Sequence, residues 1–144
     1  MRILSPDFED GQPIPKKFTC EGEDINPALE IADVPKGAKS LVLIVDDPDA
    51  PAKVWEHWTV IDIPPQISVI KQASVPGTQL ANDFGSVEWG GPCPPPGKVH
   101  NYRFKLYALS TLLSLAPSSA KESVEEAMKG HILEEAVLTG TYKR

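Results

Sequence analysis

The chain has 144 residues, of which 41% are hydrophobic and 24% are charged, a composition that excludes disordered and fibrous proteins. This length fits one domain, so we expect a single domain over residues 1–144 that folds without a metal or a cofactor. The formal net charge of -6 disfavours nucleic acid as a partner. No apolar run has the length of a signal segment or a membrane span, which predicts a cytoplasmic protein.

The apolar runs along the chain are short, and 15 prolines and 10 glycines separate them, which predicts many turns between short strands. Ser40–Asp46 is a branched apolar run, typical of a strand buried on both faces. Trp58–Ile63 is predicted as a second strand, and Asn101–Leu109 as a third. Alternation in the third strand places four side chains on one face, with His100 in phase: Tyr102, Phe104, Leu106 and Ala108.

The only good helix signal lies near the C-terminal end of the sequence. Ser119 and Glu122 match a capping box, and apolar residues continue at helical spacing through Gly130 as far as Ile132. Ala136–Tyr142 is predicted as a last strand. Together these elements predict a mainly β fold with one or two peripheral helices.

The two cysteines, Cys20 and Cys93, lie far apart and lack the spacing of metal-binding or redox motifs. We favour two free, partly buried thiols. A disulfide between them stays open, because pairing requires their Cα atoms to approach within about 7 Å.

Polar residues that could form a site lie in three rigid turns at strand ends. Asp47 and Asp49 follow the first strand in a proline-flanked turn, and His57 stands between two tryptophans. A glycine- and proline-rich loop over residues 89–97 leads to His100 and Tyr102, and its amide groups could approach a ligand closely. Each feature alone more often has a purely structural role: the aspartates as a solvated turn, His57 as a packed core residue, and the glycine- and proline-rich segment as a connecting loop. The three together suggest one pocket.

A set of spaced motifs covers nearly the whole chain: Phe18–Gly22, Asn26–Pro27, the DPDAP turn over residues 47–51, the pair His57–Trp58, Asn82–Gly85, the GGPCPPPG loop over residues 90–97, the HNY segment from His100, and Leu138–Tyr142. Together they resemble the phosphatidylethanolamine-binding family, also called Raf-kinase-inhibitor-like proteins, in its bacterial and archaeal branch. The resemblance implies a central antiparallel sheet with a second, smaller sheet and peripheral helices. It also implies an anion pocket at one end.

The resemblance implies a ligand-binding set made of Asp47, Trp55, His57, Gly91, Pro92, Cys93, His100 and Tyr102. The supporting residues would be Asp49, Pro51, Trp58 and Trp89, the last standing where the family usually has a tyrosine. Because no arginine lies in the motifs, we expect a phosphate-like or acetate-like anion to be held by the histidines, the Tyr102 hydroxyl and loop amides. Binding should tighten at lower pH as the histidines take up protons.

The favoured function is a binding or regulatory protein for phosphorylated head groups or phosphorylated partners, with a kinase among the candidate partners. Two alternatives stay open. One is a serine protease inhibitor, which the resemblance permits. The other is a hydrolytic enzyme that uses Asp47, His57 and His100, with a metal ion or with Cys93 as a nucleophile. Metal-ligand spacing is lacking, so we expect no catalysis, no metal and no cofactor. The resemblance also makes a homodimer worth testing.

Overall fold

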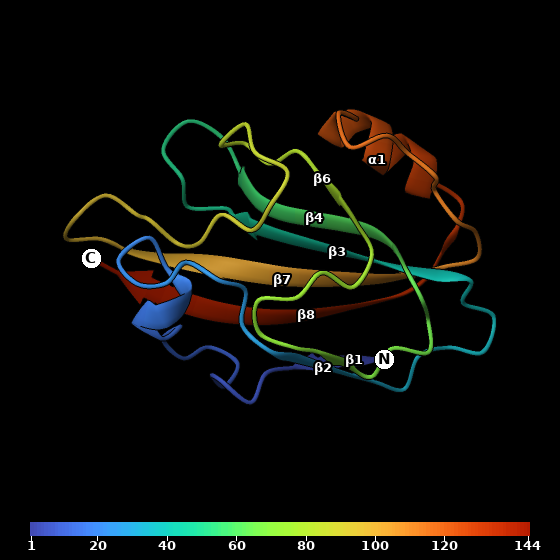
Figure 1. Cartoon of the computed structure of the whole chain (residues 1–144), viewed down its shortest axis with the longest axis horizontal. Helices are drawn as coiled ribbons and strands as arrows, with labels where there is room; N and C mark the ends of the chain where they lie inside the picture. Colours follow the sequence, from blue (N-terminus) through green and yellow to red (C-terminus); the bar gives the residue numbers. More distant parts are fainter.

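Five strands form the central sheet of the structure, a computed structural model that describes all 144 residues. In the order of the sheet they are β6 (Thr78–Leu80), β4 (Trp55–Ile63), β3 (Ser40–Asp47), β7 (Val99–Leu109) and β8 (Ile132–Lys143). A smaller sheet holds β1 (Arg2–Leu4), β2 (Leu29–Ala32) and β5 (Val69–Ile70), and the strand pairs in both sheets are antiparallel. Figure 1 shows α1 (Lys121–Met128) on one side of the central sheet and β1 and β2 on the other. A single turn of 3-10 helix, η1, spans Lys16–Phe18. The predicted mainly β architecture with two sheets is confirmed.

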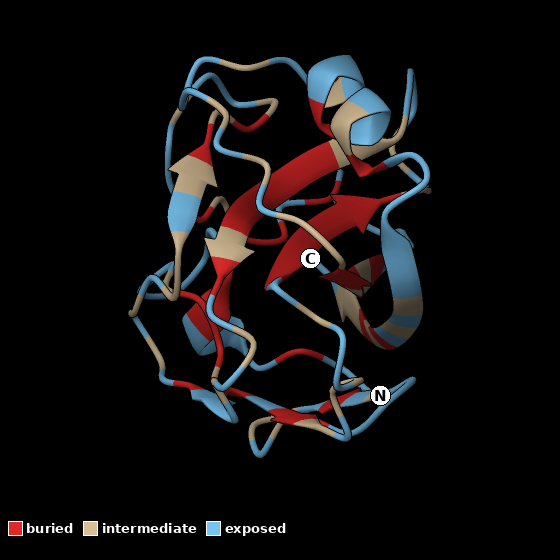
Figure 2. Ribbon diagram, turned by 90° about the vertical axis from the view of Figure 1, so that its right-hand side faces the viewer, coloured by how far each residue is buried: buried red, intermediate tan, exposed pale blue.

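Every residue of β3 is buried, as predicted for a strand covered on both faces. Leu41, Leu43 and Val45 pack into the larger hydrophobic cluster, which fills the space between the two sheets. Val42 and Ile44 point the other way, into a smaller cluster closed by α1. Figure 2 shows these buried central strands in red, with the exposed face of α1 outside them. The strand therefore divides the core into two layers by simple alternation.

β7 shows the predicted alternation, because its inward side chains all lie in the larger cluster: Tyr102, Phe104, Leu106 and Ala108. On its outward face, Arg103 and Lys105 pair with Asp46 of β3 at 2.7 Å and 2.6 Å. Only 1% of Asp46 is exposed. A carboxylate buried so deeply needs such partners, since an unpaired charge in this position is strongly unfavourable.

Three strands begin earlier than predicted, and β7 does so at Val99 rather than at Asn101. β4 begins at Trp55 rather than at Trp58, because its first residues pair with the end of β3. β8 begins at Ile132 rather than at Ala136, because it pairs with β7 along the whole of that strand. Hydrogen bonds between strands thus decide boundaries that the side-chain pattern of one segment leaves open.

The predicted capping box is wrong, and the helix is shorter than its spacing indicated. Ala120 is the N-cap of α1, and no side chain caps it. α1 ends at Met128, and Gly130 then adopts a left-handed φ of 78°, a conformation that ends helices and favours glycine. Ile132 therefore begins β8 instead of continuing the helix. Neither α1 nor any other helix has the length and the hydropathy needed to cross a bilayer.

Cys20 and Cys93 form a disulfide, so the favoured prediction of two free thiols is wrong. Their Cα atoms lie 5.5 Å apart although 73 positions separate them in sequence. The fold alone brings the segment after η1 against the 89–97 loop, where the N–H of Cys20 also donates to the carbonyl of Pro92. Disulfides persist in oxidising compartments and in the cytoplasm of hyperthermophiles, so the cytoplasmic location stays a prediction.

Trp58 is fully buried, and its ring crosses that of Trp89 edge-on with 5.5 Å between the ring centroids. We expect Trp58→Ala to lower the free energy of unfolding by about 3–5 kcal/mol, because the substitution leaves a cavity in the core. Trp55→Ala is the same change at a half-buried position and should cost clearly less. Urea unfolding followed by circular dichroism measures both. Equal midpoints for the wild type and Trp58→Ala would contradict this packing.

The disulfide closes a loop between residues 73 positions apart, and such a cross-link restricts the unfolded chain. The double variant Cys20→Ser/Cys93→Ser should lose about 2–4 kcal/mol of unfolding free energy. Reductant should lower the urea midpoint of the wild type and leave that of the double variant unchanged, which serves as the control. If thiol titration shows complete reduction and the wild-type midpoint does not move, the cross-link does not contribute to stability.

Candidate functional site

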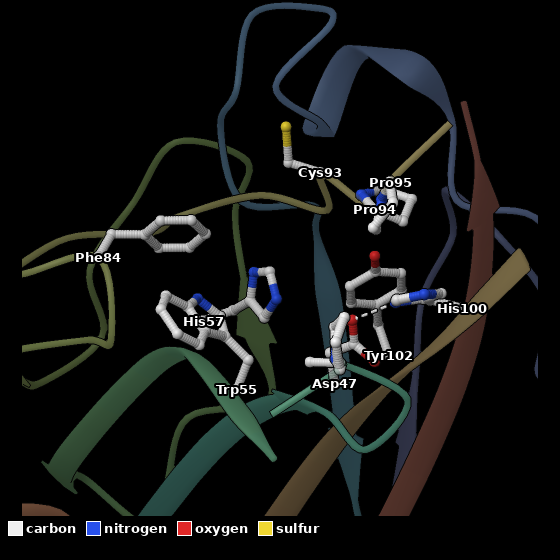
Figure 3. Close-up of a pocket in the computed structure, with 11 residues that line it drawn as sticks. Asp47, Trp55, His57, Phe84, Cys93, Pro94, Pro95, His100 and Tyr102 are labelled. Atoms are coloured by element: carbon white, nitrogen blue, oxygen red, sulfur yellow. Dashed lines mark hydrogen bonds and ion pairs between the residues drawn. The ribbon is translucent and has the colours of Figure 1, made fainter. Parts of the chain in front are cut away.

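The three turns meet at one end of the central sheet. β3 is antiparallel to both β4 and β7, so its C-terminal end lies beside their first residues. A cavity of about 230 Å³ opens there, as Figure 3 shows. It is lined by Asp47, Ala50, Pro51, Trp55, His57, Phe84, Cys93, Pro94, Pro95, His100 and Tyr102. All members of the expected ligand-binding set except Gly91 and Pro92 are among them.

A β-bulge in β4 turns His57 toward this cavity. The pairing between β3 and β4 shifts by one residue here, so that His57 is an extra residue without a partner on β3. Regular alternation would place His57 and Trp58 on opposite faces of the sheet. Instead both face the larger cluster: Trp58 belongs to it, and the His57 ring lies 5.2 Å from the ring of Tyr102.

Asp47 ends β3, and its carboxylate is held from two sides. Nδ1–H of His100 donates to Oδ2 at 2.7 Å, and the backbone N–H of Asp49 donates to Oδ1 at 2.8 Å. The side chains of His100 and Asp47 are only 6% and 5% exposed. Asp49 in turn accepts two hydrogen bonds from Asn101, which lower the pKa of its carboxyl group. Asp49 thus supports the turn and does not line the cavity.

His57 has its tautomer fixed by the protein. Nδ1–H donates to the carbonyl of Gly90 at 2.6 Å, since a carbonyl oxygen can only accept. Burial lowers the pKa of His57 below its ordinary value, although that hydrogen bond and the charge of Asp47 act in the opposite direction. Figure 3 shows the other ring nitrogen, Nε2, directed at the cavity. The uptake of protons by the histidines stays a prediction, and the lowered pKa makes the protonated form of the His57 ring less favourable than that of an exposed histidine.

The hydroxyl of Tyr102 is the only buried side-chain polar atom without a hydrogen-bond partner. The residue is 1% exposed, and Figure 3 shows its oxygen directed into the cavity toward the loop that carries Cys93 and Pro94. Burial, and then the charge of Asp47, raise its pKa, but Asp47 is not in hydrogen-bonding geometry. The phenol therefore keeps its proton and presents an unused donor. Leaving such a donor unpaired is costly, which points to a ligand.

Apolar side chains complete the wall, and four of them were missed from the sequence: Ala50, Phe84, Pro94 and Pro95. The ring of Phe84 lies edge-on to Trp55 and to His57, with centroid distances of 5.5 Å and 5.3 Å. Phe84 falls in one of the spaced motifs of the sequence, and the two prolines lie in the 89–97 loop. The sequence therefore marked these segments, but it did not indicate which of their side chains line the cavity. No lysine or arginine lines the cavity.

Gly91 and Pro92 do not line the cavity. The N–H of Gly91 donates to Asp24 at 2.8 Å, and a Cβ on Gly91 would stand 2.3 Å from the carbonyl oxygen of Phe18. The carbonyl of Pro92 accepts from Cys20. Gly91 is therefore needed for close packing of the loop against residues 18–24, and its amide is not free to bind an anion.

Trp58 and Trp89, the expected supporting tryptophans, pack in the larger cluster beneath the site. Nε1–H of Trp89 donates to the carbonyl of Phe18 at 3.2 Å. Trp89 lines a second cavity, of about 220 Å³, which shares Phe84 and Cys93 with the first. Trp89, which stands where a tyrosine is usual, thus does not line the first cavity.

The geometry gives little support to hydrolytic chemistry through a metal or a thiolate. No group of three or more histidine, cysteine, aspartate or glutamate side chains is arranged to hold a metal ion. The sulfur of Cys93 is bonded to Cys20 and is not a free nucleophile. What the site offers is a small cavity with fixed hydrogen-bonding groups on one side and apolar groups on the other.

Comparisons with known protein sequences identify relatives of this chain. A UPF0098 protein of Methanothermobacter thermautotrophicus is 48% identical to this chain, over 100% of this chain and 99% of that protein. A UPF0098 protein of Aquifex aeolicus is 45% identical, over 100% of this chain and 89% of that protein. These alignments cover the whole of the fold described above.

Solved structures and a family profile also match this chain over nearly its whole length. The crystal structure of CT736 from Chlamydia trachomatis, described as a phosphatidylethanolamine-binding protein homologue, has a TM-score of 0.95 at 42% identity and covers 99% of this chain and 97% of that chain. Escherichia coli YbcL, described as a member of the mammalian family, has a TM-score of 0.92 at 31% identity over 99% and 98%. A profile of the phosphatidylethanolamine-binding protein family matches residues 4–143. The chain therefore belongs to the phosphatidylethanolamine-binding protein family.

Proposed function

We propose that the protein is a small binding protein whose cavity takes a phosphate-like oxyanion, carried by a phosphorylated small molecule or partner. The observation that carries this proposal is the buried hydroxyl of Tyr102, which is directed into the cavity and has no partner within the protein. An oxyanion oxygen would accept its hydrogen bond and remove the cost of an unsatisfied donor.

The neighbouring groups suit one small anionic group that carries a proton, because the unprotonated Nε2 of a neutral His57 ring can only accept a hydrogen bond. His57 and His100 each use Nδ1 inside the protein, which leaves Nε2 of each ring for a ligand. Trp55 and Phe84 supply an apolar wall for the organic part of the ligand. A cavity of about 230 Å³ offers few polar contacts, so the affinity for the head group alone should be modest.

The family description supports phosphate as the anion. Phosphatidylethanolamine, from which the family takes its name, carries a phosphate in its head group, and CT736 and YbcL share that description. Acetate-like carboxylates have the same kind of acceptor oxygens and would compete with phosphate for the Tyr102 hydroxyl.

Tyr102→Phe should weaken phosphate binding by about tenfold or more, because a hydrogen bond to a charged oxygen contributes about 1.5–3 kcal/mol. The stability of the free protein should stay the same or rise, since the lost hydroxyl has no partner there. NMR titration with inorganic phosphate measures the affinity. Tyr107→Phe is the matched control, because Tyr107 packs against the smaller cluster on the other face of β7. Equal phosphate affinity of the wild type and Tyr102→Phe would reject the proposed donor.

A phosphomonoester such as methyl phosphate should bind more tightly as the pH falls from about 8 to 6, through protonation of the ligand rather than of His57. Its second pKa is near 6, so the dianion becomes a monoanion, which the carboxylate of Asp47 repels less. Burial lowers the pKa of His57, so less of this imidazole is protonated across that range than of an exposed histidine.

Calorimetric titration with methyl phosphate at several pH values measures this dependence. His57→Gln should keep the slope of affinity against pH, and Asp47→Asn should flatten it, because it removes the charge that repels the dianion. An affinity that is constant across the range, or a slope that disappears in His57→Gln, would contradict the assignment.

A further inference from the structure

We infer that the disulfide between Cys20 and Cys93 is a redox-sensitive tether of the 89–97 loop: a dithiol reduces it in the folded protein, and its reduction weakens anion binding in the first cavity. This inference rests on the proposed oxyanion site and adds a redox control to it. It follows from the position of the two sulfurs, which lie at the surface and in the walls of the two cavities.

The disulfide is accessible to a reductant. Cys20 and Cys93 are both exposed, and neither lies in a strand of the two sheets. Both also line the second cavity. Thiol–disulfide exchange requires a thiolate to reach one of the sulfurs, so access decides whether a disulfide is reduced without unfolding. A dithiol can therefore attack this bond while the chain keeps its fold.

The reaction is a two-electron exchange with a dithiol, which is either a small molecule or a protein. One thiolate of the dithiol attacks one sulfur, the bond between the two Sγ atoms breaks, and the displaced cysteine takes up a proton. The second thiol of the reductant then displaces the other cysteine, which is protonated in turn. The two cysteines gain the two electrons and two protons that the dithiol loses, and the dithiol becomes a disulfide.

Other contacts keep the chain folded when the disulfide is broken. Nε1–H of Trp89 donates to the carbonyl of Phe18 at 3.2 Å, and both side chains belong to the larger cluster. The N–H of Gly91 donates to Asp24 at 2.8 Å. These contacts hold the beginning of the loop against the segment around η1. Reduction thus removes one link among several, and its effect is local to the loop.

The tethered loop forms part of the wall of the first cavity. Cys93, Pro94 and Pro95 line that cavity, and the carbonyl of Gly90 accepts from His57. Figure 3 shows Cys93 and the two prolines on the side toward which the hydroxyl of Tyr102 is directed. A wall that is free to move has to be ordered again when a ligand binds, which lowers the affinity.

The surroundings of the disulfide add an electrostatic effect of the same sign. Cys93 and Phe84 line both cavities, so they form the boundary between them. The carboxylates of Asp24 and Glu88 line the second cavity only. When the bond breaks, the two sulfurs move apart, and this boundary opens toward those carboxylates. Negative charge that becomes accessible from the first cavity disfavours a bound anion.

Reduction of the folded wild type is the first measurement. The protein is incubated with dithiothreitol without denaturant, free thiols are trapped with iodoacetamide and counted by mass spectrometry, and circular dichroism follows the fold. Both thiols should appear while the spectrum stays native, and low concentrations of urea should leave the rate unchanged. A rate that rises with urea in step with the unfolding equilibrium would show that reduction requires unfolding, and would overturn the inference.

Amide hydrogen exchange shows whether reduction loosens the loop, independently of any ligand. The N–H groups of Cys20 and Gly91 join the loop to the segment around η1, at 3.1 Å to Pro92 and 2.8 Å to Asp24. Their exchange should become faster in the reduced protein, and that of the β3 amides should stay the same. Unchanged exchange at Cys20 and Gly91 would overturn the role of the disulfide as a tether.

NMR titration with inorganic phosphate then compares the two redox forms. The reduced wild type should bind phosphate about fivefold more weakly than the oxidised form, or weaker still, and saturating phosphate should disfavour reduction by the same factor. Cys20→Ser, measured in reductant, should match the reduced wild type, because it removes the tether and keeps Cys93 in the cavity wall.

The outcomes separate this inference from the proposed function. Equal phosphate affinity of the oxidised and reduced wild type would overturn the redox control and leave the oxyanion site standing. Cys20→Ser that binds phosphate as tightly as the oxidised wild type would do the same. Absence of phosphate binding in both redox forms would overturn the proposed function and, with it, its redox control.

Discussion

Two neighbouring carboxylates at the end of a fully buried strand are the constraint on which the rest of the structure depends. Asp46 and Asp47 close β3, where they are 1% and 4% exposed, and alternation sends them to opposite faces of the central sheet. Neither can stay ionised there without partners. Arg103 and Lys105 meet Asp46 on one face, and His100 meets Asp47 on the other. All three partners come from β7. The register of β3 against β7 therefore positions both the packing of the core and the polar groups of the cavity.

The polar side of the cavity is held in place before any ligand arrives. Asp47 and His100 hold each other, and the bulge in β4 turns His57 toward Gly90, whose carbonyl fixes its tautomer. The Tyr102 hydroxyl alone lacks a partner. Binding therefore needs little ordering of side chains, which reduces the entropic cost of capturing a small group.

Much of the fold could be predicted from the sequence, because β3 is one apolar run and β7 alternates strictly. The turns also pointed to the end of the sheet where the cavity opens, since antiparallel strands bring their ends together. The remaining features depend on contacts between distant segments. The bulge at His57 arises from the register of two strands, and the bond between Cys20 and Cys93 from packing of two loops. Gly91 looked like a ligand contact in sequence, but it serves close packing. Local pattern does not encode any of these.

The three tryptophans occupy two different environments, which gives the protein an optical reporter of its own. Trp58 and Trp89 are buried and lie edge-on to each other, whereas Trp55 is half-buried on the cavity wall beside Phe84. Indole fluorescence moves to longer wavelength as its surroundings become more polar. The short-wavelength part of the emission therefore reports on the core, and the long-wavelength part reports on the cavity. One unlabelled sample can follow unfolding and occupancy of the site as separate spectral components.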